Sequence, residues 1–467
     1  MHLARALLIA LLLATGASSA RGNGALPATT QILLPPSAPD TFIVGTNFGL
    51  VTSTDRGATW QWICEHGAGN LGSSYQLGAG PEQPVLALAV DGIALTRSLG
   101  CTWSSALEEK DLLAVDYFPD PNDGNRLMVI AFLLAAPGGY ALLEVTLTEN
   151  AKSTVRQLYA PPNGEVLRTV EIARSNPKVI YATVIAFEGT TRTARIARTE
   201  DGGITWTLTS PAPAQPDLGI LAIDPGNADT VYLRSITNNG DRLMVSLDGG
   251  KTLRNALDPF LVMSSFVRLD NGHFVVGWRD LHRGFIYRST DQAATFTRLP
   301  PTFQPLALAQ RDGHLYATSD ISTNKFALAV SDDEGETWTQ TLALQDVSAT
   351  AACPNALDLC SAVCDRLQPA SIFNPQVCTT AAGAPDAGDR DAAAEANDDA
   401  TGDSPVGRDE DVPAAAPDAG ADGAAGPASK AGGCSCAIIA GRTRRPDTWS
   451  LLIAVSLTAI MLRRRRW

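Results

Sequence analysis

The octapeptide SDDEGETW at residues 331–338 has three close relatives in the chain: STDRGATW at 53–60, TEDGGITW at 199–206 and SLDGGKTL at 246–253. All four share the pattern Ser/Thr-x-Asp-x-Gly-x-Thr, and three of them end in Trp. A short motif that recurs along a chain indicates a repeat architecture, in which every copy belongs to one supersecondary unit. The spacing of the copies therefore decides which repeat fold is expected.

Three worn copies complete the series. STDQAATF at 289–296 has Ala and Phe in the Gly and Trp places, TRSLGCTW at 96–103 has Ser in the Asp place, and TENAKSTV at 148–155 keeps only Asn150 and Thr154. The Asp positions then fall at 55, 98, 150, 201, 248, 291 and 333, spaced 43, 52, 51, 47, 43 and 42 residues apart. Seven units of this length predict an all-β fold, a seven-bladed β-propeller of four-stranded blades over residues 29–347.

The sequence before each motif agrees with this fold. In the fifth unit the runs LGILAID at 218–224, TVYLRSI at 230–236 and RLMVSLD at 242–248 are short, rich in β-branched residues and separated by turn residues. Sustained apolar spacing of 3.6 residues is not found in this region, so helices are not expected.

The motif is expected at the hairpin between the third and fourth strands of a blade. Its Asp accepts hydrogen bonds from the tight turn, and its Gly supplies a positive φ. Its Trp folds back under the turn, and truncating such a residue costs about 3–5 kcal/mol. These side chains are therefore interpreted as structural, and the positions concerned are Asp55, Trp60, Trp103, Asp201, Trp206, Asp248, Asp291, Phe296, Asp333 and Trp338.

The octapeptides resemble Asp-box (BNR) repeats, which occur in sialidases, xyloglucanase-type glycoside hydrolases, sortilin-like receptors and photosystem II assembly factors. The resemblance covers roughly residues 29–347. It implies the blade fold and does not select an activity, because a fold by itself carries none.

The N-terminal residues 1–20 have the pattern of a secretory signal peptide. Basic residues precede an apolar run from Ala6 to Ala14, and small residues stand at the −3 and −1 positions, Ser18 and Ala20. Cleavage is expected after Ala20. The apolar run is much shorter than the ~20 residues of a membrane span, which argues against an uncleaved anchor.

The C-terminal residues predict a membrane segment. Thr448 to Leu462 form a 15-residue apolar run, and four arginines follow at 463–466. A helix of this length covers ~22 Å of a ~30 Å hydrocarbon core, so it spans only if the arginines snorkel. The arginine block predicts that this end stays in the cytoplasm and that the rest of the chain is outside.

Gly433 and Cys434 precede that helix, and Cys436 follows them closely. A Gly-Cys motif, a short hydrophobic helix and a terminal arginine cluster together resemble the MYXO-CTERM tail of myxobacterial surface proteins, here at residues 434–467. The resemblance implies cleavage near Gly433 by a sorting protease, lipid modification of Cys434 and display on the cell surface. The alternative is a permanent tail anchor at 448–462.

Residues 380–433 predict a disordered linker built from Ala, Asp, Gly and Pro. From Thr379 to Gly433 there are twelve acidic residues against three basic ones, a balance of −9 within a formal net charge of −13. Such a segment has too little apolar surface to fold. The globular part is therefore close to neutral, which argues against nucleic acid as a partner.

Cysteines in an exported chain point to disulfide bonds. A Cys-rich module is expected at 348–379, and the alternative of a zinc site is disfavoured because no CxxC or neighbouring His is found. Two bridges among Cys353, Cys360, Cys364 and Cys378 allow three pairings, which stay open, and Cys64 and Cys101, in adjacent blades, are a further candidate bridge. The full set of candidates is Cys64, Cys101, Cys353, Cys360, Cys364 and Cys378.

The sequence predicts no catalytic, cofactor or metal residues. Four carboxylates lie outside motifs and turns without distinguishing context: Asp116, Glu144, Glu165 and Glu171. The main hypothesis is a non-catalytic module that binds protein or glycan, and the alternative is a sialidase- or xyloglucanase-like glycoside hydrolase. Two carboxylates about 5–10 Å apart in an aromatic cleft would favour hydrolysis. Trp278 and Arg279, in FVVGWRDLHRGF, are the residues near a loop to examine first.

Overall fold

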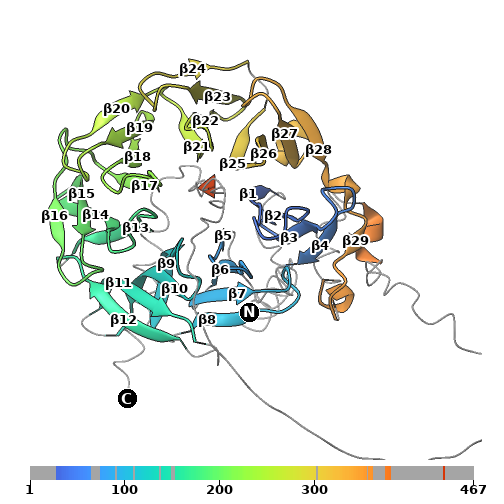
Figure 1. Ribbon diagram of the computed structural model, residues 1–467, viewed down its shortest axis with the longest axis horizontal. Coiled ribbons are helices and arrows are strands. Elements are labelled where there is room, and N and C mark those ends of the chain that lie inside the picture. The colour runs from blue at the N-terminus through green and yellow to red at the C-terminus, as the bar shows by residue number, and fades with distance from the viewer. Residues whose placement is uncertain are drawn as a thin grey trace, which may run out of the picture.

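The computed structural model describes residues 28–64, 74–89, 92–108, 111–135, 138–148, 153–162, 164–300, 303–354, 356–360, 374–379 and 435–436. Seven antiparallel sheets succeed one another around a ring (Figure 1). The prediction of a seven-bladed propeller is therefore confirmed. Within the described residues, no helix is long and apolar enough to cross a membrane.

Every blade consists of four consecutive strands, and the first strands lie around the inside of the ring (Figure 1). Blades 1 to 4 comprise β1 (Thr29–Leu33), β2 (Phe42–Thr46), β3 (Gly49–Ser53) and β4 (Gln61–Cys64); β5 (Tyr75–Leu77), β6 (Val85–Ala89), β7 (Gly92–Thr96) and β8 (Ser104–Glu108); β9 (Leu112–Pro119), β10 (Arg126–Leu133), β11 (Gly139–Thr146) and β12 (Thr154–Tyr159); β13 (Val166–Ile172), β14 (Ile180–Glu188), β15 (Thr191–Thr199) and β16 (Thr207–Thr209).

Blades 5 to 7 follow the same order. They comprise β17 (Leu218–Ile223), β18 (Val231–Thr237), β19 (Gly240–Ser246) and β20 (Arg254–Leu257); β21 (Val262–Arg268), β22 (Phe274–Arg279), β23 (Gly284–Ser289) and β24 (Thr297–Arg298); β25 (Pro305–Arg311), β26 (His314–Ser319), β27 (Leu328–Ser331) and β28 (Thr339–Leu342). Short helices stand at α2 (Ile321–Asn324), η1 (Leu344–Asp346) and η3 (Pro375–Cys378).

The alternation of strand direction gives the ring two different faces. The start of every first strand and the hairpin between second and third strands lie at one face, named here the entry face. The octapeptide hairpins, between third and fourth strands, lie at the opposite face, named the box face. Side chains of the two faces therefore do not meet.

The octapeptide of blade 7 shows how the hairpin is fixed. Asp333 accepts a bond from the N–H of Thr337 (2.8 Å) and another from its hydroxyl (2.6 Å). Ser331 accepts from the N–H of Gly335 (2.7 Å), whose carbonyl accepts from the indole of Trp338 (3.0 Å). The same Asp-to-Thr bonds occur at Asp55, Asp201, Asp248 and Asp291.

These bonds favour the charged form of the Asp. The hydroxyl of Thr295 contributes most to lowering the pKa of Asp291, to about 2. The aromatic residue of the motif is buried at Trp60 and half-buried at Trp103, Trp206, Phe296 and Trp338. It lies against aromatic neighbours, as where Trp338 meets Phe303 edge-on at 5.2 Å.

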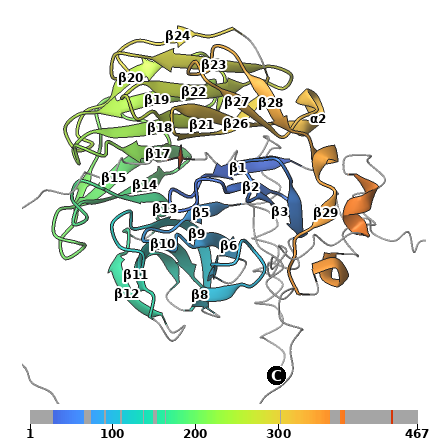
Figure 2. The same cartoon turned by 45° about the vertical axis from the view of Figure 1, so that its right-hand side comes forward.

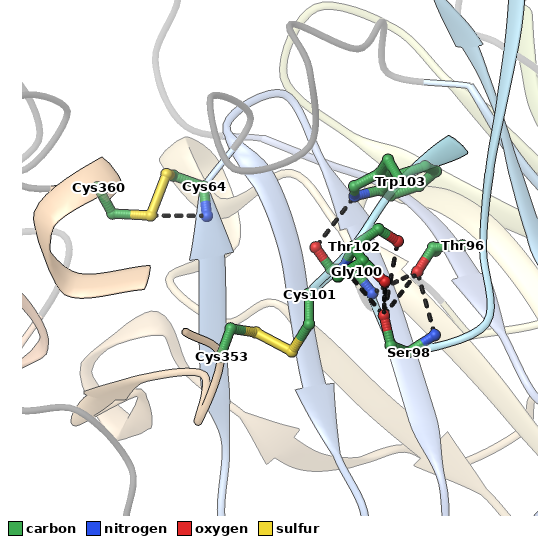
Figure 3. The surroundings of a disulfide bond; sticks show 9 residues. All are labelled: Cys64, Thr96, Ser98, Gly100, Cys101, Thr102, Trp103, Cys353 and Cys360. Carbon is green, nitrogen blue, oxygen red and sulfur yellow. Dashed lines mark hydrogen bonds between the residues drawn. A yellow bond between two sulfur atoms is a disulfide. The ribbon is translucent and has the colours of Figure 1, made fainter. Parts of the chain in front are cut away.

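The worn copy in blade 2 keeps the hairpin with a different polar group. The hydroxyl of Ser98 accepts from the N–H of Thr102 (2.9 Å) and lies 2.8 Å from its hydroxyl, as Figure 3 shows. Ser98 therefore substitutes for the carboxylate. In the third copy, Asn150 lies outside the described residues.

The motif Gly has a second role that sequence reasoning missed. A Cβ at Gly250 would lie 2.9 Å from Cδ1 of Ile196 in the preceding blade, and one at Gly203 would lie 2.9 Å from Leu158. Both glycines have a φ of 91°, in the left-handed region. The residue must be small because the hairpin packs directly on the neighbouring blade. Blade 6 departs from this rule, with the buried Ala293 at φ 60°.

Gly250→Ala is expected to lower the free energy of unfolding by roughly 2–4 kcal/mol, since it adds left-handed backbone strain to overpacking against Ile196. The reciprocal change Ala293→Gly relieves about 1 kcal/mol of strain and loses a similar amount of methyl burial, so its net effect should stay below about 1 kcal/mol. Urea unfolding of both variants measures the difference. Equal midpoints for the two variants would contradict the packing argument.

The ring does not close by sharing strands between its first and last blades, because β1 to β4 and β25 to β28 form separate sheets. The last segment instead crosses the seam. The short strand β29 (Ala349–Thr350) pairs in parallel with the outer edge of β4. Direct contacts at the seam include the guanidinium of Arg311, which lies 4.3 Å from the ring centroid of Phe42 and donates to the carbonyl of Thr41 (2.7 Å).

Two disulfides attach the C-terminal module to the propeller. Cys64, at the end of β4, is bonded to Cys360, and Cys101, in the octapeptide of blade 2, is bonded to Cys353 (Figure 3). The suggested bridge between Cys64 and Cys101 is therefore wrong, and so is pairing of Cys353 and Cys360 within the module. β29 brings the module to the flank of blade 1, where each of these cysteines meets a propeller partner; Figure 2 shows the module beside β29.

Several predicted features lie outside the described residues. They are the signal peptide 1–20 with Ala20, the linker 380–433, Gly433, Cys434, the apolar run 448–462 and Cys364. Cys378 is disulfide-bonded. The short strand β30 (Ser435–Cys436) pairs antiparallel with β21, and Figure 1 draws it inside the ring.

Candidate functional site

A cavity of about 640 Å³ occupies the centre of the ring. Its walls come chiefly from the first strands of blades 1 to 5, β1, β5, β9, β13 and β17. A cavity of this size lies within the range of small-ligand sites. It is the place where the ring offers an enclosed surface to a ligand.

A polar side chain bonds to the backbone of the neighbouring blade at each of the seven blade junctions around this cavity. Asp116 accepts from the N–H of Val170 (3.0 Å), and Thr169 accepts from the N–H of Ile220 (2.9 Å). The other junctions are bridged by Gln31 with Tyr75, Gln76 with Tyr117, Asp241 with Met263, Gln310 with Asp270 and Thr29 with Ser319. Polar residues of the inner strands therefore have a structural role in holding the ring.

Two of the four carboxylates singled out in the sequence, Asp116 and Glu171, come together in this cavity. Burial raises the pKa of Asp116 to about 7, against the lowering effect of the backbone N–H of Val170. Burial, and after it the charge of Asp116, raises the pKa of Glu171 to about 8. Glu171 is buried and Asp116 is half-buried. Buried carboxyls with raised pKa values are groups that general acid–base chemistry uses.

The other two carboxylates lie elsewhere and are neutralised by arginines. Glu144 lies 2.8 Å from Arg126 and 3.0 Å from Arg156. Glu165 lies 2.8 Å from Arg195. Neither Glu144 nor Glu165 lines the central cavity. Both are therefore ion-pair residues of the blades.

The raised pKa values of Asp116 and Glu171 predict that the free energy of unfolding falls as the pH rises. In the unfolded chain their pKa values are ordinary, near 4, so the folded state binds protons more tightly. Their contribution is complete below about pH 4 and is lost as the pH rises through about 7 and 8. Each group contributes a slope of about −1.4 kcal/mol per pH unit within its window.

Urea unfolding at pH 5, 7 and 9 measures this slope. Glu171→Gln, which imitates the neutral acid, is expected to flatten the loss of stability above pH 5. Glu165→Gln is the matched control outside the cavity and should keep the wild-type slope. If the free energy of unfolding of Glu171→Gln depends on pH as steeply as that of the wild type, Glu171 is not the source of the pH dependence.

At the entry face, arginines gather around the mouth of the cavity. Arg234 lines the cavity and donates twice to Oδ2 of Asp241, at 3.0 and 2.6 Å, with both side chains buried. Arg168 also lines it, and its Nε lies 2.9 Å from Oδ1 of Asp217 without the alignment of a hydrogen bond. Burial raises the pKa of Asp217 in spite of the neighbouring arginines.

The two residues marked for first examination have different environments. Trp278 is fully buried, and its indole N–H has no hydrogen-bond partner among the described residues. Arg279 is half-buried at the entry-face end of β22, and within the described ranges it makes no ion pair or hydrogen bond. Burial lowers the pKa of Arg279, the charge of Asp320 raises it, and the charge of Arg234 lowers it. Arg279 is therefore the stronger candidate for a ligand contact.

Among the described residues, neither a histidine nor a metal-binding cluster extends the candidate site. His273 lies 2.8 Å from Glu334, and His314 lies 2.6 Å from Asp332. In the part of the chain that the structure describes, no group of three His, Cys, Asp or Glu side chains is arranged to hold a metal ion.

Sequence reasoning named Asp116 and Glu171 but did not bring them together, and it missed the arginines at the cavity mouth. A signal was present, because both acids interrupt apolar first strands, in LLAVDYFP and VLRTVEI. An acid inside an otherwise apolar inner strand indicates either a bond to a neighbouring strand or a functional site.

No protein-family model matches this chain, and neither does any curated protein sequence. Among solved structures it is similar to a GH74 enzyme from Niastella koreensis (14% identity, TM-score 0.38, 67% of this chain and 65% of that one) and to a GH74 xyloglucanase from Xanthomonas campestris (14%, 0.36, 68% and 60%). It is also similar to YCF48 from Cyanidioschyzon merolae (13%, 0.44, 66% and 96%). The chain thus spans less than two thirds of either GH74 enzyme. These likenesses do not bear on its activity.

Proposed function

We propose that this protein is an exported, surface-anchored propeller of the Asp-box (BNR) type that binds glycan or protein ligands without catalysis. Residues 1–20 act as the signal peptide, and the MYXO-CTERM-like tail at 434–467 delivers the chain to the cell surface. A sorting protease cuts near Gly433, and Cys434 carries the lipid. The linker 380–433 then holds the propeller away from the membrane.

The entry face is the observation that carries the binding role. Six of its large apolar side chains are exposed, Leu113, Leu134, Phe187, Phe260, Val262 and Leu281, at 42–81%. Exposed apolar side chains on one face of a protein are typical of interaction sites. The cavity carboxyl Asp116 is meanwhile bonded to the backbone of the next blade, which suits a structural role.

A glycoside hydrolase is the second candidate, and the raised pKa values of Asp116 and Glu171 favour it. A hydrolase of this kind needs one protonated and one ionised carboxyl across the scissile bond. The two readings differ in whether the bound polysaccharide is cut.

The test applies full-length protein to a panel of immobilised polysaccharides and surface-protein extracts, and measures both retention and new reducing ends. Binding without catalysis predicts retention with no new reducing ends, in the wild type and in Glu171→Gln alike. New reducing ends that disappear in Asp116→Asn and Glu171→Gln but persist in Glu165→Gln would contradict the proposal. Retention on no member of the panel would contradict it as well.

Mass spectrometry of the mature protein tests the proposed export and surface anchoring. Cleavage after Ala20 and near Gly433, with a lipid on Cys434, is the expected result. An intact C-terminus would contradict surface sorting.

A further inference from the structure

At the entry face, blades 4 and 6 each carry an exposed aromatic residue and an arginine that forms no ion pair with any described residue. In blade 4, Phe187 and Arg192 are directly opposite each other at the hairpin between β14 and β15. Phe187 is 50% exposed, and Arg192 is exposed and makes no ion pair within the described ranges. In blade 6, Arg279 is opposite Val262, two residues after Phe260.

Phe260 has a conformation that packing alone does not explain. It is 67% exposed, and its φ of 59° lies in the left-handed region, which is rare for a bulky residue. Its neighbour Leu261 accepts a bond from the N–H of Asp241 (2.8 Å), which fixes the loop between blades 5 and 6. A strained backbone that holds an aromatic ring in solvent is typical of a ligand contact.

Blade 5 lies between these two sites in the ring (Figure 1) and joins them electrostatically. The charges of Arg168 and Arg192 act on Asp217, and the charge of Arg234 acts on both Asp217 and Arg279. The four arginines therefore contribute together to a positive electrostatic potential at the entry face. Asp217 and Asp241 form ion pairs with Arg168 and Arg234, whereas Arg192 and Arg279 form no ion pair with any described residue and can contact an anion.

We propose that the entry face over blades 4 to 6 binds a glycan that carries carboxylate groups, with Arg192 and Arg279 contacting the carboxylates and Phe187 and Phe260 packing against sugar rings. This inference rests on the proposed binding function and narrows it to one ligand class. A planar guanidinium matches a carboxylate with two parallel hydrogen bonds. A flat aromatic face offers a large apolar area to the C–H face of a sugar.

The shape of the site favours a glycan over a protein partner. The central cavity of about 640 Å³ reaches this part of the entry face at Arg168 and Arg234, and a volume of that size holds a few sugar rings. A protein interface of ordinary stability instead needs a broad, closely packed surface. The cationic mouth is also opposite in sign to the acidic linker and to the net charge of the whole chain, −13.

The experiment measures affinity of the full-length protein for a tetrameric uronate oligosaccharide and for the same tetramer with its carboxyls reduced to alcohols. Wild type is expected to bind the uronate at least roughly tenfold more tightly, with a preference that shrinks as salt rises. Arg192→Gln and Arg279→Gln should each weaken uronate binding roughly tenfold and leave the reduced tetramer unaffected. Phe260→Ala should lower the affinity for both tetramers by a similar factor.

Arg283→Gln is the matched control, because Arg283 lies on the same face but is paired with Asp280 at 3.0 Å. It should stay within about twofold of wild type, since exposed pairs contribute little. Thermal unfolding verifies that each variant is folded. Equal affinity for the two tetramers would overturn the carboxylate inference while leaving the binding function intact. Binding of neither tetramer, together with no retention on the polysaccharide and protein panel, would overturn both.

Discussion

Removing both disulfides between the C-terminal module and the propeller is expected to lower the free energy of unfolding by about 10 kcal/mol, a loss that would leave a typical domain largely unfolded. The bridges Cys64–Cys360 and Cys101–Cys353 join residues 296 and 252 positions apart. Since the first and last blades share no strand, these bonds and β29 add covalent and strand-pairing links to the direct seam contacts of Thr29 with Ser319 and of Arg311 with Thr41.

The two bridges should not contribute additively. With one of them intact, the other closes a loop of only about 45 residues, so either pair of Cys→Ala substitutions alone should cost about 4 kcal/mol. The double removal should therefore cost more than twice as much. Guanidinium unfolding of the two single-bridge variants and the double variant gives the three free energies of unfolding to compare. A double variant as stable as either single one would mean that the seam contacts of Arg311 and Phe42 close the ring unaided.

Asp241→Ala is expected to cost about 3–5 kcal/mol, because it leaves the buried guanidinium of Arg234 without its counter-ion. The same oxygen of Asp241 also accepts the N–H of Met263 (2.9 Å), so the junction between blades 5 and 6 loses its polar bond. The free energy of unfolding in urea is the measurement. The pair Arg234→Met with Asp241→Leu should recover most of the loss, since an apolar pair leaves no buried charge.

Glu82→Ala provides the contrast, because Glu82 and Arg97 form an ion pair with both side chains about half exposed or more. Its expected cost is below about 1 kcal/mol. If Asp241→Ala and Glu82→Ala cost the same, the buried pair is not a link between blades.

The number of blades could be predicted because each octapeptide satisfies itself locally. Asp333 bonds to Thr337 only four residues away, and the indole of Trp338 bonds to Gly335 three residues away. A hairpin with such short-range bonds leaves its pattern in the sequence wherever it recurs. Even the Ser98 copy keeps its spacing to Thr102.

The contacts between blades could not be predicted, because they depend on register between segments about one repeat apart. Gln31 meets Tyr75, 44 residues later, and Asp116 meets Val170, 54 residues later. Cys64 was matched with the wrong partner for the same reason: its true partner is 296 residues away, on a segment that crosses the seam. The pairing of Arg279 with Val262 likewise depends on a register shift between Met263 and Ser265.

Hydrogen exchange of the full-length protein, with and without a saturating polysaccharide from the binding panel, tests the role of the entry face most directly. Ligand-dependent protection is expected at the β14–β15 hairpin, at the loop before β21 and at the end of β22, around Phe187, Phe260 and Arg279. The octapeptide hairpins of the box face should exchange as before. Protection confined to the box face, or to the C-terminal module, would contradict the account.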